Sequence, residues 1–424
     1  MKNMKRFFWK ISVLAIVLIF LWTSLEFAVA QNNHIPVSNS SPKRIIMPLT
    51  QENNSGAGYV KYTLVLFNNT LINGNYVNTS NGYRPVEVAF DSSNGYVYVT
   101  NHLSNNVSVI NGATNTVIQT IPVGSGPYGV AFDSSNGYVY VANCLSNNVS
   151  VINGATNTVI QTIPVGSGPE GVAFDSSNGY VYVTNDGLNT VSVINGATNT
   201  VIQTIPVGFW PAGVAFDSSN GYVYVANNFF LSNTVSVING ATNTVIQTIP
   251  VGSDPSGVAF DSSNGYVYVT NEGSNTVSVI NGATNTVIQT IPVGSDPSGV
   301  AFDSSNGYVY VTNYLSNNVS VINGANNTVI KTIPVGSDPS GVAFDSSNGY
   351  VYVTNEGSGT LSIIPASVTI SVQLLSNYLL YVIILIVVII AVLGVVITMR
   401  RGKKKQGPKQ WQEPAKEKPE EEKK

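Results

Sequence analysis

Cysteine and histidine are scarce in this chain of 424 residues, and each shortage excludes a class of protein. The single cysteine, Cys144, can form no intrachain disulfide, so the chain is not a small disulfide-stapled domain. The two histidines, His34 and His102, are too few for a histidine cluster that binds copper or zinc. No glycine-rich phosphate loop opens a helix. We therefore predict no catalytic residue, no metal ligand, no cofactor and no enzymatic activity.

Basic residues are also rare, except at the two ends of the chain. Residues 31–377 contain five Lys and Arg against sixteen Asp and Glu, so no basic patch is present and nucleic acid is excluded as a partner. Residues 1–30 combine a basic start, an apolar run at 11–22 and Ala-Val-Ala at 28–30, which predicts a cleaved signal peptide. The apolar run is short for a bilayer, although an uncleaved anchor stays open.

A second apolar segment, residues 379–399, contains no charged residue and is long enough to cross a membrane as a helix. The basic tail at 400–424 follows it directly, and positive-inside bias places that tail in the cytoplasm. We therefore expect a single-pass cell-membrane protein with its large middle region outside the cell.

That middle region is built from repeats. The motif AFDSSNGYVYV occurs seven times, with its aspartate at 91, 133, 175, 217, 261, 303 and 345. Five of the six spacings are 42 residues, and the sixth is 44 because Phe229, Phe230 and Leu231 lengthen one loop. Each repeat holds four short runs rich in Val, Ile, Tyr and Thr, separated by turn residues such as Asn-Gly.

Four strands in about 40–45 residues are typical of one propeller blade. The prediction is therefore an all-β, seven-bladed β-propeller with four-stranded blades at 59–365 and one C-terminal transmembrane helix. A flexible linker at 31–58 precedes the propeller, and a juxtamembrane stalk at 366–378 follows it. A stacked β-solenoid is the alternative architecture, although its repeats are usually shorter.

The seventh repeat lacks its fourth strand, whereas strand-like residues precede the first repeat. TLVLF begins at Thr63 and LINGNYV begins at Leu71. The simplest interpretation is that this N-terminal segment supplies the outer strand of blade seven and closes the ring. The rival closing segment is 367–372.

The tetrapeptide YVTN at 98–101, 182–185, 268–271, 310–313 and 352–355 resembles the YVTN-family β-propeller repeat of archaeal cell-surface and surface-layer proteins. Blades two and four read YVAN instead, at 140–143 and 224–227. The resemblance covers about residues 85–365. It implies a seven-bladed ring and a surface location, but it implies little about chemistry.

Differences among the seven copies concentrate in the loop after the second strand and the loop before the first. Both loops should emerge on one face, around the mouth of the central channel, where we expect a protein or glycan ligand. Blade four places aromatic residues there, namely Phe209, Trp210, Phe229 and Phe230. Local packing of an enlarged loop is the alternative.

Blades five to seven place mostly acidic residues in the same loops: Asp254, Glu272, Asp296, Tyr314, Asp338 and Glu356. These residues are further candidates for partner binding. A carboxylate arc could hold a cation such as Ca²⁺, but solvated surface charge is the more common reading.

Taken together, these patterns predict a membrane-anchored module for binding, adhesion or envelope structure at the cell surface. A lactonase- or dehydrogenase-like propeller enzyme and a single-pass surface sensor are the alternatives.

Overall fold

The computed structural model describes residues 50–52, 59–66, 76–78, 84–229, 232–365 and 368–375, with side chains at 84–229 and 232–365. The predicted signal peptide, the predicted span at 379–399 and Phe230 lie outside these ranges. Within the ranges, no helix has the length and apolar character needed to cross a membrane.

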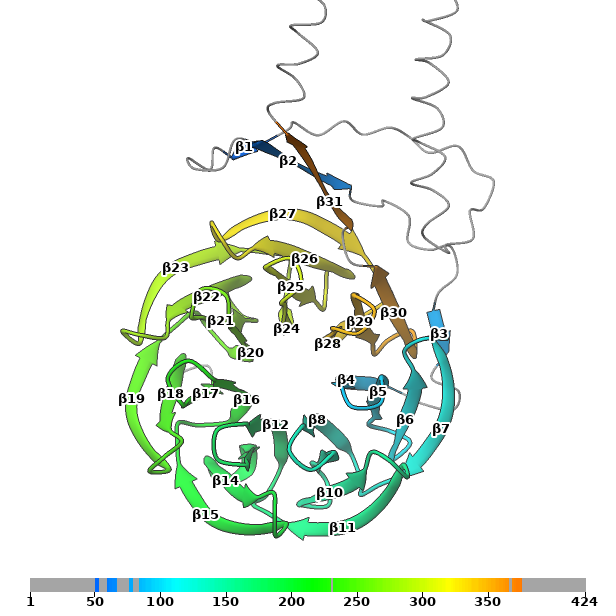
Figure 1. Ribbon diagram of the computed structural model, residues 1–424. Helices are drawn as coiled ribbons and strands as arrows, with labels where there is room; N and C mark the ends of the chain where they lie inside the picture. The colour runs from blue at the N-terminus through cyan, green and yellow to red at the C-terminus, as the bar shows by residue number, and fades with distance from the viewer. Residues whose placement is uncertain are drawn as a thin grey trace, which may run out of the picture. The chain divides into compact units, whose positions relative to one another are not determined.

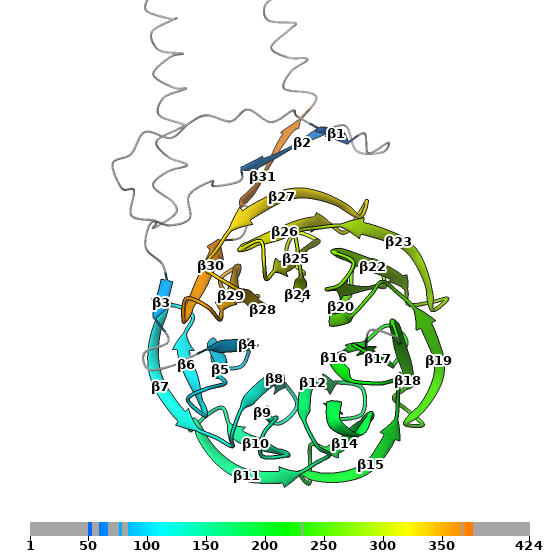
Figure 2. The same cartoon turned by 180° about the vertical axis from the view of Figure 1, so that it is seen from behind.

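The described repeats form seven four-stranded antiparallel blades around one axis (Figures 1 and 2), so the predicted seven-bladed propeller is confirmed. The innermost strands are β4 (Pro85–Asp91), β8 (Pro127–Asp133), β12 (Pro169–Asp175), β16 (Pro211–Asp217), β20 (Pro255–Asp261), β24 (Pro297–Asp303) and β28 (Pro339–Asp345). The second strands are β5 (Tyr96–Asn101), β9 (Tyr138–Asn143), β13 (Tyr180–Asn185), β17 (Tyr222–Asn227), β21 (Tyr266–Asn271), β25 (Tyr308–Asn313) and β29 (Tyr350–Asn355).

Two further strands complete each blade toward the rim. The third strands are β6 (Asn106–Asn111), β10 (Asn148–Asn153), β14 (Thr190–Asn195), β18 (Thr234–Asn239), β22 (Thr276–Asn281), β26 (Asn318–Asn323) and β30 (Thr360–Pro365). The outer strands are β7 (Thr116–Pro122), β11 (Thr158–Pro164), β15 (Thr200–Pro206), β19 (Thr244–Pro250), β23 (Thr286–Pro292), β27 (Thr328–Pro334) and, in blade seven, β3 (Tyr76–Asn78). A short 3-10 helix, η1 (Asp186–Leu188), follows β13.

The YVTN motif makes contacts both between neighbouring blades and within one blade, and each of its residues makes a different contact. In blade one the Tyr98 hydroxyl donates to Asn157 Oδ1 of blade two at 2.7 Å, and Thr100 Oγ1 donates to the Tyr128 carbonyl of blade two at 2.6 Å. Asn101 Nδ2 donates to Ser108 Oγ of its own third strand at 2.9 Å. The valine, Val99, is fully buried. The YVAN blades lack the threonine, and therefore its bond to the next blade.

The identical DSSNG segments are turns, as predicted. In blade one, Asp91 Oδ1 accepts hydrogen bonds from the Ser93 backbone N–H and hydroxyl, and Gly95 adopts a φ of 75°. The buried aspartate also reaches the next blade indirectly, because Asn94 Nδ2 bridges Asp91 Oδ2 and the Gly154 carbonyl. We call the end of the ring that carries these turns and the turns between third and outer strands the turn face.

The hydrophobic core is divided into seven layers, one at each junction between blades. The layer between blades one and two contains Val107 and Val109 from one side and Val139 and Val141 from the other, all fully buried. Because both faces of each sheet are covered in this way, the second strands are apolar on both faces. Because the seven blades have nearly the same strands and core layers, they hold each loop at an equivalent position.

Ring closure uses the N-terminal segment, as predicted. β3 pairs antiparallel with β30, with Val77 opposite Leu361, and so becomes the outer strand of blade seven. The rival segment pairs elsewhere, since β31 (Val368–Leu375) lies against β2 (Tyr59–Leu66).

One boundary differs from the prediction. β2, β31 and β1 (Thr50–Glu52) form a separate three-stranded sheet, so residues 59–66 lie outside the seven blades and the predicted stalk contains a paired strand. Both β2 and β31 are eight-residue apolar-rich strands, and they pair with each other over their full length.

Candidate functional site

The two variable loops of each blade meet on one face, as predicted. The residue before each inner strand accepts a backbone hydrogen bond from the residue after the second strand of the same blade, for example Trp210 from Asn228 and Asp254 from Glu272. We call this end of the ring the loop face. It comprises these paired residues and the remaining residues of the two loops, and it lies at the opposite strand ends from the turn face.

The residue before each inner strand has left-handed backbone geometry, with φ between 52° and 63° in all seven blades. Glycine and aspartate, which tolerate this conformation, occupy five of the positions: Gly126, Gly168, Asp254, Asp296 and Asp338. Arg84 and Trp210 are bulky exceptions, each at a cost of about 1–2 kcal/mol. Backbone strain of this kind clusters at functional sites, which draws attention to these two residues.

Three of the four predicted aromatic residues form one cluster. The Phe229 ring lies 4.9 Å from the Trp210 ring and 5.7 Å from the Phe209 ring, centroid to centroid. Phe209 is 58% exposed and Trp210 is 48% exposed, so the cluster is a surface feature with only part of its area packed internally. Phe230 lies outside the described residues.

Exposed leucines extend this apolar surface in other blades, and the sequence analysis overlooked them. Leu103, Leu145, Leu188 and Leu315 are 55–69% exposed, and each lies in the loop after a second strand. Aligning the loops for apolar side chains in every blade, instead of for aromatic residues alone, would have found them. The loop face therefore combines exposed apolar residues from five blades.

The six predicted residues of blades five to seven are brought together in pairs. Backbone hydrogen bonds join Asp254 to Glu272, Asp296 to Tyr314 and Asp338 to Glu356. The left-handed backbone explains why aspartate recurs at three of these sites. Among the described residues, no group of three or more His, Cys, Asp and Glu could hold a metal ion, so the calcium alternative gains no support.

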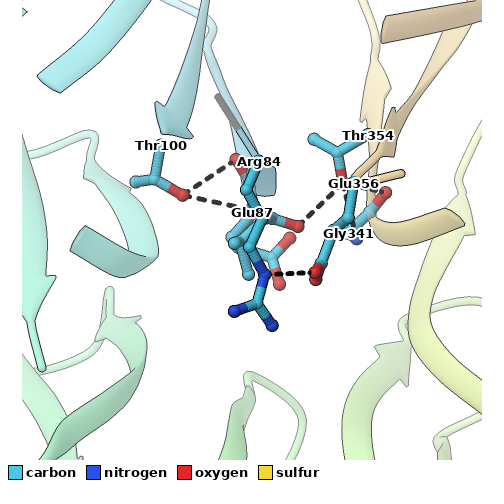
Figure 3. A network of polar contacts seen from close by, with 7 residues as sticks. Arg84, Glu87, Thr100, Gly341, Thr354 and Glu356 are labelled. Carbon is cyan, nitrogen blue, oxygen red and sulfur yellow. Dashed lines mark hydrogen bonds and ion pairs between the residues drawn. The ribbon is translucent and has the colours of Figure 1, made fainter. Parts of the chain in front are cut away.

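An ion pair that sequence reasoning missed spans the junction between the last and first blades. Arg84 Nε lies 2.7 Å from Glu356 Oε2, and the Glu356 side chain is only 5% exposed (Figure 3). The hydrogen bond that Arg84 donates to Glu356 raises the pKa of Arg84, although burial opposes the rise. Two residues 272 positions apart carry no local signal in the sequence, because their contact depends on ring closure.

Glu87 lies at the same junction, in a position that is glycine in the other six blades (Figure 3). A Cβ at Gly341 of blade seven would collide with Glu87 Oε1 and with the backbone of blade one. Thr354 Oγ1 donates to the Val86 carbonyl at 2.7 Å, which joins the second strand of blade seven to the inner strand of blade one. Burial raises the pKa of Glu87 to about 7, although the Val88 backbone N–H opposes the rise.

A second carboxyl on an inner strand belongs to Glu170, the second residue of β12. Burial is the main cause that raises its pKa to about 8, and the charges of Asp186 and Glu272 add to the effect. A hydrogen bond from Tyr128 acts in the opposite direction. Burial also lowers the pKa of His102, with a further contribution from Arg84. The site therefore holds two carboxyls whose pKa values lie near neutral pH and an imidazole whose pKa is lowered.

These shifts predict that the ring is more stable at pH 5.5 than at pH 8.5. In the folded protein the carboxyls of Glu87 and Glu170 have pKa values of about 7 and about 8, against the ordinary glutamate value of 4.5 in the unfolded chain. The folded state therefore binds protons more tightly, and stability is lost as pH rises from 4.5 through these values. Denaturant midpoints measured across this range should fall with pH.

Glu170→Gln should raise the midpoint at pH 8.5 and flatten the profile, and adding Glu87→Gln should flatten it further. A midpoint that increases from pH 5.5 to pH 8.5 in the unmodified protein would contradict this assignment.

The charge of the loop face is strongly one-sided. Eight carboxyl groups lie in its loops or at the adjacent ends of the inner strands: Glu87, Glu170, Asp186, Asp254, Glu272, Asp296, Asp338 and Glu356. Arg84 is the only Lys or Arg among the described residues of that face. The seven turn aspartates lie at the opposite end. An acidic surface with exposed leucine and aromatic side chains can contact a ligand that is both cationic and apolar.

Comparisons with known proteins support the fold. A family model described as YNCE-like beta-propeller matches residues 211–361, and one described as Lactonase, 7-bladed beta-propeller, matches residues 112–239. The chain is thus a β-propeller repeat protein. The solved structure of Kuenenia stuttgartiensis Hydrazine Synthase is similar, with 18% identity and a TM-score of 0.61 over 68% of this chain and 96% of that chain. This low identity shows the fold alone. A search of curated proteins finds no match.

Proposed function

We propose that the protein is a cell-surface recognition module that binds a basic, partly apolar protein surface on its loop face. The carrying observation is the gathering of exposed apolar residues there, with Phe209, Trp210 and Phe229 in one cluster, because grouped exposed apolar side chains mark interaction surfaces whereas single ones do not. The near-identity of the turn face and the variation of the loop face agree with this division of roles.

The backbone of Trp210 supports the proposal independently. A glycine or aspartate would adopt its φ of 52° at lower cost, as in the equivalent positions of five other blades. Retaining a half-exposed tryptophan in a strained conformation is consistent with an interface anchor, since Trp is enriched among residues that dominate binding energy. Charge complementarity adds the preference for a basic partner.

Anchoring at the cell surface, with the propeller outside, is the second part of the proposal. Its support is the signal-like segment 1–30, the uncharged segment 379–399 with its basic tail, and the resemblance to archaeal surface-layer repeats. Protease added to intact cells should then remove the propeller and leave the tail protected.

The binding test compares three forms of the full-length protein in pull-downs from a solubilised cell-envelope fraction. Replacing Phe209, Trp210 and Phe229 by Ser should abolish retention of a defined partner. Replacing Ile118, Ile160 and Ile202 by Ser is the matched control, since these outer-strand residues are 45–46% exposed and lie away from the loops. The control variant should still retain the partner, and rising salt should weaken that retention. Equal loss in both variants would reject the loop face as the site.

Lactone hydrolysis is a second candidate, favoured by the lactonase family model over residues 112–239. Glu170 lies within that range, and its raised pKa suits a carboxyl that exchanges protons near neutral pH. Purified protein should then open simple γ- or δ-lactones, and Glu170→Gln should reduce the rate at least tenfold. Turnover that is absent, or unchanged in the variant, rejects this candidate without affecting the binding proposal.

A further inference from the structure

We infer that Asn326, on the turn face of blade six, is the residue of the described blades that accepts an N-linked glycan. Four Asn-x-Ser/Thr sequons fall within the described side chains, namely those of Asn106, Asn148, Asn318 and Asn326. Such a sequon is necessary for N-glycosylation outside the cytoplasm, but the acceptor amide must also be accessible. The structure separates the four on this second requirement.

Three of the sequons use their asparagine to hold the blade together. Asn106 starts the third strand of blade one, where its Oδ1 accepts from Asn101 Nδ2 at 2.8 Å and its Nδ2 donates to the Ser104 carbonyl at 3.2 Å. Asn148 and Asn318 make the equivalent pairs of bonds. The other four blades place threonine at this site. Threonine hydroxyls accept the same bond there, so these sequons reflect a structural role of the asparagine.

Asn326 differs from these three because it is exposed and its side-chain nitrogen is unoccupied. The turn reads NGATNT in blades one to five but NGANNT in blade six, which creates the sequon Asn326-Asn327-Thr328. No hydrogen bond engages Asn326 Nδ2 among the described residues. The adjacent Asn327 is held instead, because its Oδ1 accepts from the Tyr268 hydroxyl of blade five at 2.6 Å.

The sequon hydroxyl is already placed against the acceptor amide. Thr328 Oγ1 donates to Asn326 Oδ1 at 2.7 Å, which polarises the amide and leaves Nδ2 pointing away from that bond. The corresponding residues of blade five, Thr284 and Thr286, have their hydroxyl oxygens 2.8 Å apart. The substitution of Asn for Thr at position 326 therefore fits the existing turn without rearrangement.

The modification would proceed by glycosyl transfer from a polyprenyl-phosphate-linked oligosaccharide. Asn326 Nδ2 attacks the anomeric carbon of the first sugar, the bond from that carbon to the phosphate oxygen breaks, and the lipid phosphate leaves. The amide nitrogen loses one proton to a base of the transferase. The glycan would then lie on the turn face, at the opposite strand ends from the loop face, and would leave partner binding unobstructed.

The test is translation of the full chain with endoplasmic-reticulum microsomes, followed by glycopeptide mass spectrometry of protease-protected material. We expect a glycan on Asn326, which is lost in both Asn326→Gln and Thr328→Ala, and no glycan on Asn106, Asn148 or Asn318. Thr284→Asn is the matched gain-of-site control, since it builds Asn-Asn-Thr in the same exposed turn of blade five. That variant should acquire one further glycan.

Three outcomes would overturn the inference. The first is an unmodified Asn326 in protected chain, and the second is modification of the three strand-start asparagines in its place. The third is a chain that never enters the microsomes, since the modification requires an extracytoplasmic turn. The inference rests on the extracytoplasmic placement proposed above, so the third outcome rejects that placement as well, whereas the first two reject the glycan alone. None of the three depends on whether the loop face binds a partner.

Discussion

Replacing Gly213 by alanine is expected to destabilise the propeller by about 3 kcal/mol or more, at the upper end of the cost of overpacking a well-packed interior. Gly213 is the third residue of β16, and a Cβ there would collide with the Ser256 carbonyl oxygen of the next inner strand. The Ser256 oxygen belongs to the backbone and the added Cβ is fixed by the backbone of residue 213, so no side-chain rotation can relieve the collision. The inner strands would have to separate, and each is already fixed by a neighbour on its other side.

Gly221 in the same blade provides the matched control. Its φ is 75°, but a Cβ there would meet nothing within 4 Å, so Gly221→Ala should cost only the left-handed backbone penalty of about 1–2 kcal/mol. Denaturant unfolding of both variants measures the difference. If Gly213→Ala costs no more than Gly221→Ala, the inner ring is less tightly packed than this geometry requires.

The strands and turns of the blades were largely predictable from local residues. Asn-Gly in each DSSNG segment demands a positive φ, and Gly95 and its six counterparts adopt it. Valine on one face of YVYV and tyrosine on the other require a sheet covered on both sides, and the seven junction layers cover it. Repetition strengthens such inferences, because a single misread turn would have to recur seven times.

The site was less predictable, because its contacts join residues that only ring closure brings together. The bond between Arg84 and Glu356 and the burial of Glu87 follow from the junction of first and last blades. The partner of β2 was equally hidden, since an apolar strand can pair with many sheet edges. Differences among the repeats did predict that the two variable loops of each blade meet on one face, because departures from a repeated sequence are easily seen.

β3 is the one outer strand that does not follow its blade in the chain, and its pairing with β30 joins the two ends of the propeller. Without it, the backbone of β30 would become a free edge next to Leu361, which is fully buried. Free edges of this kind promote pairing with other chains.

Replacing Tyr76, Val77 and Asn78 by Gly-Pro-Gly should therefore lower the stability of the propeller by about 2–4 kcal/mol. Lost ladder hydrogen bonds contribute about 1 kcal/mol each, and partial exposure of the buried leucine contributes a similar amount. The variant should also aggregate faster, because β30 then presents an unpaired edge.

The same replacement at residues 369–371 in β31 is the control, and it should affect the blades much less since that strand pairs with β2. Thermal unfolding and light scattering of both full-length variants decide the matter. A larger loss from the β31 replacement would mean that the C-terminal strand closes the ring.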